Sequence, residues 1–182
     1  MKMVMRLLKI GFALTLLITV IIFPSLSVAG EQQSLEYKLK ALYIVRLAAF
    51  ITWPENSENQ TFKICIDSSD QIASQLRQMS VSKIKGRKLE IIDLPVDASI
   101  SQCFVLYLLH GQVKPLLVHM PVLTVSSQEN FAEQGGMIEF YIDRNKVRMK
   151  ANLHAVNKAG IKLSSKLIRL LSIVEPLEKR DD

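Results

Sequence analysis

The feature that most constrains the fold is an unbroken apolar run, Cys-Phe-Val-Leu-Tyr-Leu-Leu, at positions 103–109. A strand covered by protein on both faces has this composition, whereas a half-exposed strand alternates apolar and polar side chains. Strands of that kind occur in sheets that are covered by helices. The run therefore predicts a buried strand of an α/β protein.

Shorter patterns predict the other elements. Residues 35–51 lack Gly and Pro and end before Trp53-Pro54, where proline disfavours helix in the residue before it. Gln71 begins an amphipathic stretch, and Asp-Arg-Asn at 143–145 is a plausible tight turn. We expect helices at 35–51, 71–79 and, weakly, 113–119, strands at 62–66, 88–94 and 122–125, and a hairpin formed by 136–142 and 146–151.

The last segment has a helical period. Apolar residues recur every three or four positions from Leu153 to Val174, and Gly160 is expected to divide the segment into two pieces, with Ser164 or Ser165 capping the second. The whole pattern predicts a single-domain, layered α/β sandwich with helices on both faces of the sheet. The sheet should be mixed and mostly parallel, with a long N-terminal helix and a C-terminal helical segment.

Residues 1–29 resemble a secretory signal peptide. Lys2, Arg6 and Lys9 precede an apolar run at 10–23, and Ser-Val-Ala at 27–29 offers small residues for cleavage near Ala29. The apolar run has about 14 residues and a membrane span needs about 20. We expect export through the inner membrane and one domain at 30–182, with an uncleaved anchor as the alternative.

Charge and cysteine content narrow the class. The chain carries 23 basic and 17 acidic residues, and three of the basic residues lie in the predicted signal, which leaves +3. That charge is too small, and too evenly spread, to indicate nucleic acid binding. After export, Cys65 and Cys103 can form a disulfide; two buried thiols are the alternative.

Catalytic motifs are absent from the sequence. The three histidines, 110, 119 and 154, are not in a metal-binding pattern, no nucleophile motif occurs, and Gly135-Gly136 is best interpreted as a turn. Asp67 and Asp70 follow the first strand, where α/β proteins often bind ligands, although helix capping is the more ordinary role. We expect no enzyme activity, no metal and no cofactor.

The order of several segments resembles the YfiR-like family of periplasmic regulatory proteins. The resemblance starts at Lys-Ala-Leu-Tyr (40–43) and Phe-Ile-Thr-Trp-Pro (50–54), and covers nearly the whole exported chain. It continues through Phe-Lys-Ile-Cys-Ile (62–66), Gly-Arg (86–87), Gln-Cys-Phe-Val-Leu-Tyr (102–107), Pro-Val-Leu-Thr-Val-Ser (121–126), Gly-Gly-Met-Ile (135–138) and Ala-Gly-Ile-Lys-Leu-Ser-Ser-Lys-Leu (159–167).

This resemblance implies a regulator rather than an enzyme. A YfiR-like protein is expected to form a homodimer, to bind the periplasmic domain of an inner-membrane sensor, and to repress it. That sensor would be a diguanylate cyclase, so the protein would control cyclic di-GMP and biofilm formation. A periplasmic small-solute-binding module, with a cleft at Asp67 and Asp70, is the alternative, and a hydrolase ranks last. The expected partner or dimer surface comprises Tyr43, Arg46, Trp53, His154, Lys158 and Ile161.

Overall fold

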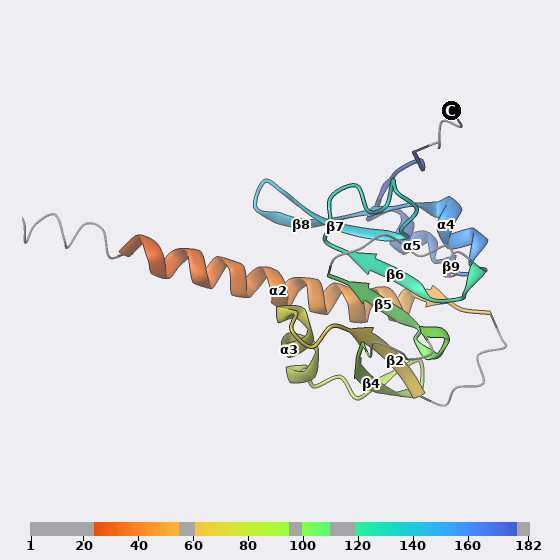
Figure 1. Ribbon diagram of the computed structural model, residues 1–182, viewed down its shortest axis with the longest axis horizontal. Coiled ribbons are helices and arrows are strands. Elements are labelled where there is room, and N and C mark those ends of the chain that lie inside the picture. Colours follow the sequence, from red (N-terminus) through yellow and green to blue (C-terminus); the bar gives the residue numbers. More distant parts are fainter. Residues whose placement is uncertain (1–23, 55–60, 95–99, 110–118, 178–182) are drawn as a thin grey trace, which may run out of the picture. The chain divides into compact units, whose positions relative to one another are not determined.

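The structure is a computed structural model that describes residues 24–54, 61–94, 100–109 and 119–177 (Figure 1). By its internal contacts the chain divides into two units, Met1–Glu36 and Tyr37–Asp182. In the first unit the described residues form the start of helix α2 (Pro24–Phe50). The apolar run of the predicted signal peptide lies outside the described residues. Among those that are described, no helix combines the length and apolarity that a membrane crossing requires.

Helix α2 confirms the predicted long N-terminal helix, although it begins at Pro24, eleven positions before the expected start. Within the second unit its buried residues include Ala41, Ile44, Leu47 and Ala48, at the spacing of three and four that places side chains on one face. Arg46, between them in sequence, is exposed. The helix therefore buries one stripe of side chains along this part of its length.

The larger sheet is mixed and mostly parallel, as predicted. Its described strands lie in the order β10-β8-β7-β6-β5-β2-β4-β3, and five of the seven neighbouring pairs are parallel. The strands are β2 (Thr61–Ile66), β3 (Lys83–Ile84), β4 (Arg87–Asp93), β5 (Val105–Leu108), β6 (Leu123–Ser126), β7 (Ile138–Asp143), β8 (Lys146–Ala151) and β10 (Ser172–Ile173).

Two hairpins close the ends of the parallel part. The predicted hairpin is confirmed: β7 and β8 pair antiparallel around Arg144 and Asn145, which both have φ values near +50° to +60°. Two consecutive positive φ values are the geometry of a type I′ turn, whose twist matches that of paired strands. The sequence pattern missed the second hairpin, in which the two-residue strand β3 pairs with β4.

The described helices contribute to a single face. Side chains of α2, α3 (Gln71–Gln78), α4 (Leu153–Lys158) and α5 (Ser165–Ile168) join one large core with Phe62, Ile64 and Tyr107 of the sheet. The other face carries a smaller cluster of Cys65, Cys103, Leu106 and Val122. No described α-helix contributes to that cluster, and the weak helix predicted at 113–119 lies almost wholly outside the described residues. Within the described ranges, helices cover one of the two faces, and the expectation for the other face stays a prediction.

The C-terminal segment is less helical than its period suggested. Two helical pieces exist, α4 and α5, but the strand β9 (Lys162–Leu163) separates them and β10 follows the second. Gly160 divides the segment as predicted, with φ +72°, and the Ser164 side chain caps α5. Strand β9 forms because it pairs antiparallel with β1 (Ile51–Thr52), a partner that periodicity cannot reveal.

The turn before β7 depends on a missing side chain. A Cβ atom at Gly136 would lie 2.2 Å from the buried ring of Phe131. We predict that Gly136→Ala lowers the free energy of unfolding by about 1–3 kcal/mol or more, because ring and backbone must move apart. Gly86→Asn is the control: no atom lies within 4 Å of its Cβ position, and Asn tolerates the positive φ of +80° at this site. Denaturant unfolding measures the free energy of unfolding of both variants. If both lose the same amount, the steric overlap with Phe131 is not the reason that position 136 requires glycine.

Candidate functional site

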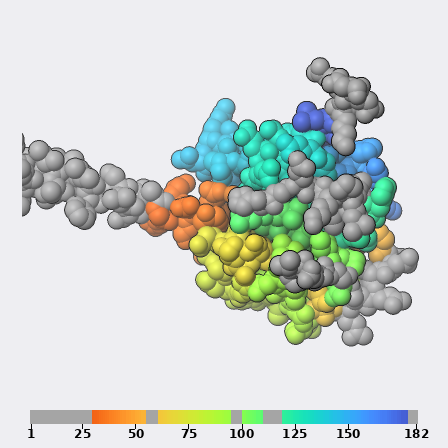
Figure 2. Space-filling view, viewed as in Figure 1, coloured from red at the N-terminus to blue at the C-terminus, as the bar shows by residue number. Residues whose placement is uncertain are grey.

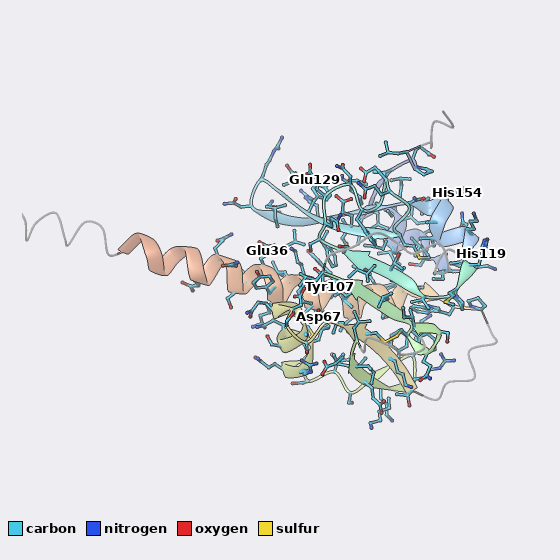
Figure 3. The ribbon with its side chains drawn as sticks, viewed as in Figure 1. Glu36, Asp67, Tyr107, His119, Glu129 and His154 are labelled. Atoms are coloured by element: carbon cyan, nitrogen blue, oxygen red, sulfur yellow. A yellow bond between two sulfur atoms is a disulfide. The ribbon has the colours of Figure 1, made fainter. Side chains whose placement is uncertain are left out.

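The carboxyl end of β2 lies at a topological switch point of the sheet. The chain runs from β2 to β4 on one side and then crosses to β5 on the other side of β2. Ligands of open α/β sheets often bind at such a point. Asp67 directly follows β2, and Ile66 pairs in register with Tyr107 of β5, so both residues lie at this edge (Figure 3).

The two aspartates of this edge make local hydrogen bonds. The Asp67 carboxylate accepts from the Ser69 backbone N–H at 2.8 Å and from the Ser69 hydroxyl at 2.7 Å. Buried Asp70 accepts from the Ile72 N–H at 2.7 Å and caps α3. The capping role expected for an aspartate here is thus confirmed for Asp70, and its carboxylate is occupied by the fold. A ligand cleft formed by Asp67 and Asp70 stays a prediction.

Hydroxyl groups on the next strands complete the edge. The phenol oxygen of Tyr107 lies 2.9 Å from the Ser127 hydroxyl oxygen. Ser126 donates to the Leu108 carbonyl at 2.7 Å and accepts from the Gln128 N–H at 3.0 Å. These bonds fix the chain where β5 and β6 end. Tyr107 and Ser126 are buried, whereas Asp67 and Ser127 are partly exposed polar side chains of this edge.

Cys65 and Cys103 form a disulfide, which settles the alternative of two free thiols in favour of pairing. The bond joins β2 to the residues just before β5 and closes a separation of 38 residues. Loop closure of that length stabilises the fold by about 4 kcal/mol on the chain-entropy model. Both cysteines are buried in the smaller cluster, so the bond staples the face that the described helices leave uncovered.

An aromatic cluster brings together motifs that are distant in the sequence. Trp53 contacts Phe62 and Phe104 edge-on, with ring centroids 5.3 and 5.5 Å away, and those two rings stack at 4.5 Å. The Arg87 guanidinium lies 4.9 Å from the centre of the Phe104 ring. Such contacts each add about 0.5–1.5 kcal/mol beyond area burial. Four segments of the family resemblance therefore meet in the core, where they hold the fold together.

The six residues of the expected partner surface fall into two groups. Arg46, His154 and Lys158 are exposed, and Tyr43 is half-buried with its ring centre 6.4 Å from that of Phe140. Trp53 and Ile161 are buried in the large core. The first four have side chains that a partner can reach, whereas the other two support the fold. Whether a partner binds here stays a prediction.

The sequence pattern missed an ionic cluster around the buried carboxylate of Glu139. The ammonium of Lys150 lies 2.9 Å from the Glu133 carboxylate and 3.1 Å from that of Glu139. Glu139 also accepts from the Ala132 N–H at 3.1 Å, and Asn152 donates to the Ala132 carbonyl at 2.8 Å. The cluster fixes the turn between β6 and β7 onto the hairpin. Glu139 and Lys150 are cross-strand partners in the β7–β8 hairpin, so an exact register of that hairpin is the signal that could have found this pair.

Opposite charges shift the ionisation of this cluster. Burial by itself raises the pKa of Glu133, but hydrogen bonds from Lys150 and the backbone outweigh it, and the pKa lies below the ordinary value of 4.5. The hydrogen bond to Glu133 raises the pKa of Lys150 above 10.5 despite burial. Glu133 therefore stabilises the fold above its ordinary pKa, and this contribution is lost as pH falls through its lowered value. The contribution of Lys150 is lost only as pH rises above its raised value.

Comparison with known proteins places the chain in a family. A family profile described as YfiR/HmsC-like matches residues 37–171, about three quarters of the chain. The chain belongs to the YfiR/HmsC-like family. The match contains both cysteines, the aromatic cluster and the Lys150 cluster, so it covers nearly all of the second unit. A search of curated proteins found no match to the chain.

No described group of three or more His, Cys, Asp or Glu side chains is arranged to hold a metal ion. Two basic side chains within the fold bind other parts of the protein: Arg87 packs on the Phe104 ring, and Lys150 forms an ion pair with Glu139. What the described residues of this YfiR/HmsC-like protein present is therefore a stapled scaffold with polar groups at one sheet edge.

The Lys150 cluster yields a pH-dependent prediction. In Lys150→Met, Glu139, whose side chain is 1% exposed, loses its cation, so the free energy of unfolding near pH 7 should fall by about 3–5 kcal/mol. The loss should shrink as pH falls through the lowered pKa of Glu133, because protonation of that carboxylate removes its ion pair with Lys150. Denaturant unfolding at pH 7 and pH 3.5 measures both. Lys146→Met, an exposed change on the same strand, should cost under about 0.5 kcal/mol. Equal losses by Lys150→Met at the two pH values would refute the ionic role.

Proposed function

We propose that this protein is a periplasmic regulator that binds the periplasmic domain of an inner-membrane diguanylate cyclase and holds the enzyme inactive. The observation that carries the proposal is the YfiR/HmsC-like match across residues 37–171. Members of that family are regulatory rather than catalytic. Release of the sensor would raise cyclic di-GMP and favour biofilm formation.

The disulfide supports export as part of this proposal. Disulfides persist in oxidising compartments such as the periplasm and are rare in the cytosol. In this chain both cysteines are buried and paired, and a predicted signal peptide precedes the domain. The disulfide and the predicted signal peptide both support a location in the periplasm.

Repression by binding requires a difference in affinity. A regulator shifts its sensor toward the inactive state only by as much as it binds that state more tightly than the active one. A rigid surface suits this task, since it penalises sensor conformations that do not fit. The stapled sheet and the three-ring cluster supply that rigidity. We further propose that the working form is a homodimer.

The expected partner surface leads to the first test. Arg46→Ala with His154→Ala, both at exposed positions, should weaken capture of the sensor from detergent-solubilised inner membranes by at least about tenfold. Cyclic di-GMP should rise in cells that carry this variant in place of the wild type. Arg144→Asn, exposed at the tip of the β7–β8 hairpin, is the control, because it removes one positive charge and Asn tolerates the positive φ of this turn. If membrane-protein mass spectrometry finds no diguanylate cyclase with wild-type bait, the proposed partner is wrong.

Export is tested separately. The protein recovered from the periplasmic fraction should begin at Gly30 and lack the mass of residues 1–29, because a signal peptidase would cut after Ala29. Intact-mass spectrometry reads this directly. A full-length chain in the membrane fraction would instead establish an anchor.

A small-solute-binding module is the second candidate, and the switch point at Asp67 favours it. A solute that binds only the folded state raises the melting temperature. A thermal-shift screen of small polar metabolites should then find a compound whose effect is lost in Asp67→Asn. If no compound shifts the melting temperature, the solute-binding candidate is rejected and the regulator proposal is the one that stands.

A further inference from the structure

The positive charge of the exported chain is concentrated in one segment. Residues 152–174 contain Lys158, Lys162, Lys166 and Arg169 and no Asp or Glu. The rest of residues 30–182 holds 16 basic and 17 acidic residues, so it carries −1 where the segment carries +4. The charge is thus less evenly spread than the composition suggested.

The fold gathers these cations beside the end of α2. All four side chains are exposed, on α4, β9, and α5 with its C-cap. Strand β9 pairs with β1, and the Ser164 N–H donates to the Phe50 carbonyl at 3.2 Å, which places the segment against residues 50–52. None of the four cations forms an ion pair with another described residue. We call this set, with Phe50 and Leu170, the basic surface.

Large apolar side chains accompany the cations. Leu170, which is 71% exposed, directly follows Arg169, and Phe50, which is 49% exposed, adjoins Ser164 through the backbone hydrogen bond. Apolar side chains flanked by Lys and Arg are the composition of surfaces that lie in a bilayer interface, with the cations at the headgroups. The basic surface has this composition.

The type of cation distinguishes between two classes of partner. Protein–protein interfaces are enriched in Arg and depleted of Lys, because Arg binds carboxylates with two parallel hydrogen bonds. Three of the four cations here are Lys, which acts as a point charge and suits a diffuse field of phosphates. We propose that the basic surface binds the anionic phospholipid headgroups of a bilayer. This goes beyond sensor binding: it holds the regulator at the membrane in which its sensor is embedded.

Vesicle binding tests the proposal with protein recovered from the periplasmic fraction. Co-sedimentation should show binding to vesicles of phosphatidylglycerol and phosphatidylcholine in equal parts, and little binding to phosphatidylcholine alone. Lys162→Gln/Lys166→Gln/Arg169→Gln, which leaves Lys158 of the expected partner surface intact, should weaken binding about a hundredfold, since each cation near an anionic surface contributes about fivefold. Salt of about 0.5 M should release the wild type, because it shortens the screening length.

A matched variant separates the surface from overall charge. Lys38→Gln/Lys83→Gln/Lys146→Gln removes three exposed lysines from α2, β3 and β8 and changes the net charge equally. Melting curves establish that both triple variants fold. The proposal is supported if only the first variant loses binding. It is overturned if both lose equally, if neutral vesicles bind as well, or if the first variant loses sensor capture but not vesicle binding. Sensor capture by the vesicle-deficient variant distinguishes this failure from failure of the regulator proposal.

Discussion

The junction between β2 and β5 is the constraint on which the rest of the structure depends. On one face of the sheet Phe62 stacks on Phe104 and both rings pack against Trp53; on the other face Cys65 is bonded to Cys103. Because successive residues of a strand point to opposite faces, β2 and the residues just before β5 are joined by the stacked rings on one face and by the disulfide on the other. Parallel pairing of β2 with β5 creates the switch point, and Trp53 ties the end of α2 to it.

Most residues that carry the family resemblance stabilise the fold. Trp53, Phe62, Arg87 and Phe104 come from four motifs that are far apart in the chain and meet in one cluster. Gly136 is needed because the ring of Phe131 occupies the space of its side chain. A family recognised through such residues is recognised by its scaffold. Its function must then be tested at exposed positions such as Arg46 and His154, or at the basic surface.

A regulator that acts by binding needs surfaces rather than a reaction centre, and the described molecule offers three. The sheet edge at Asp67 presents hydroxyls and a carboxylate, the exposed side of α2 and α4 presents Arg46 and His154, and the C-terminal segment presents lysines with exposed Leu170. They differ in chemistry, so each suits a different class of partner. This separation allows sensor binding, solute binding and membrane contact to be tested with variants that do not share a residue.

The sequence by itself determined the α/β class, the long helix and the β7–β8 hairpin, because periodicity and turn residues are local properties. It narrowed each of two helix caps to a pair of residues, from which the structure selects Asp70 and Ser164. Tertiary structure decided what depends on contacts between distant segments. It paired β9 with β1 where a helical period continued, buried Trp53 and Ile161, and brought Lys150 to Glu133. Long-range pairing and burial depend on which segments meet in space, and no local pattern in the chain encodes that.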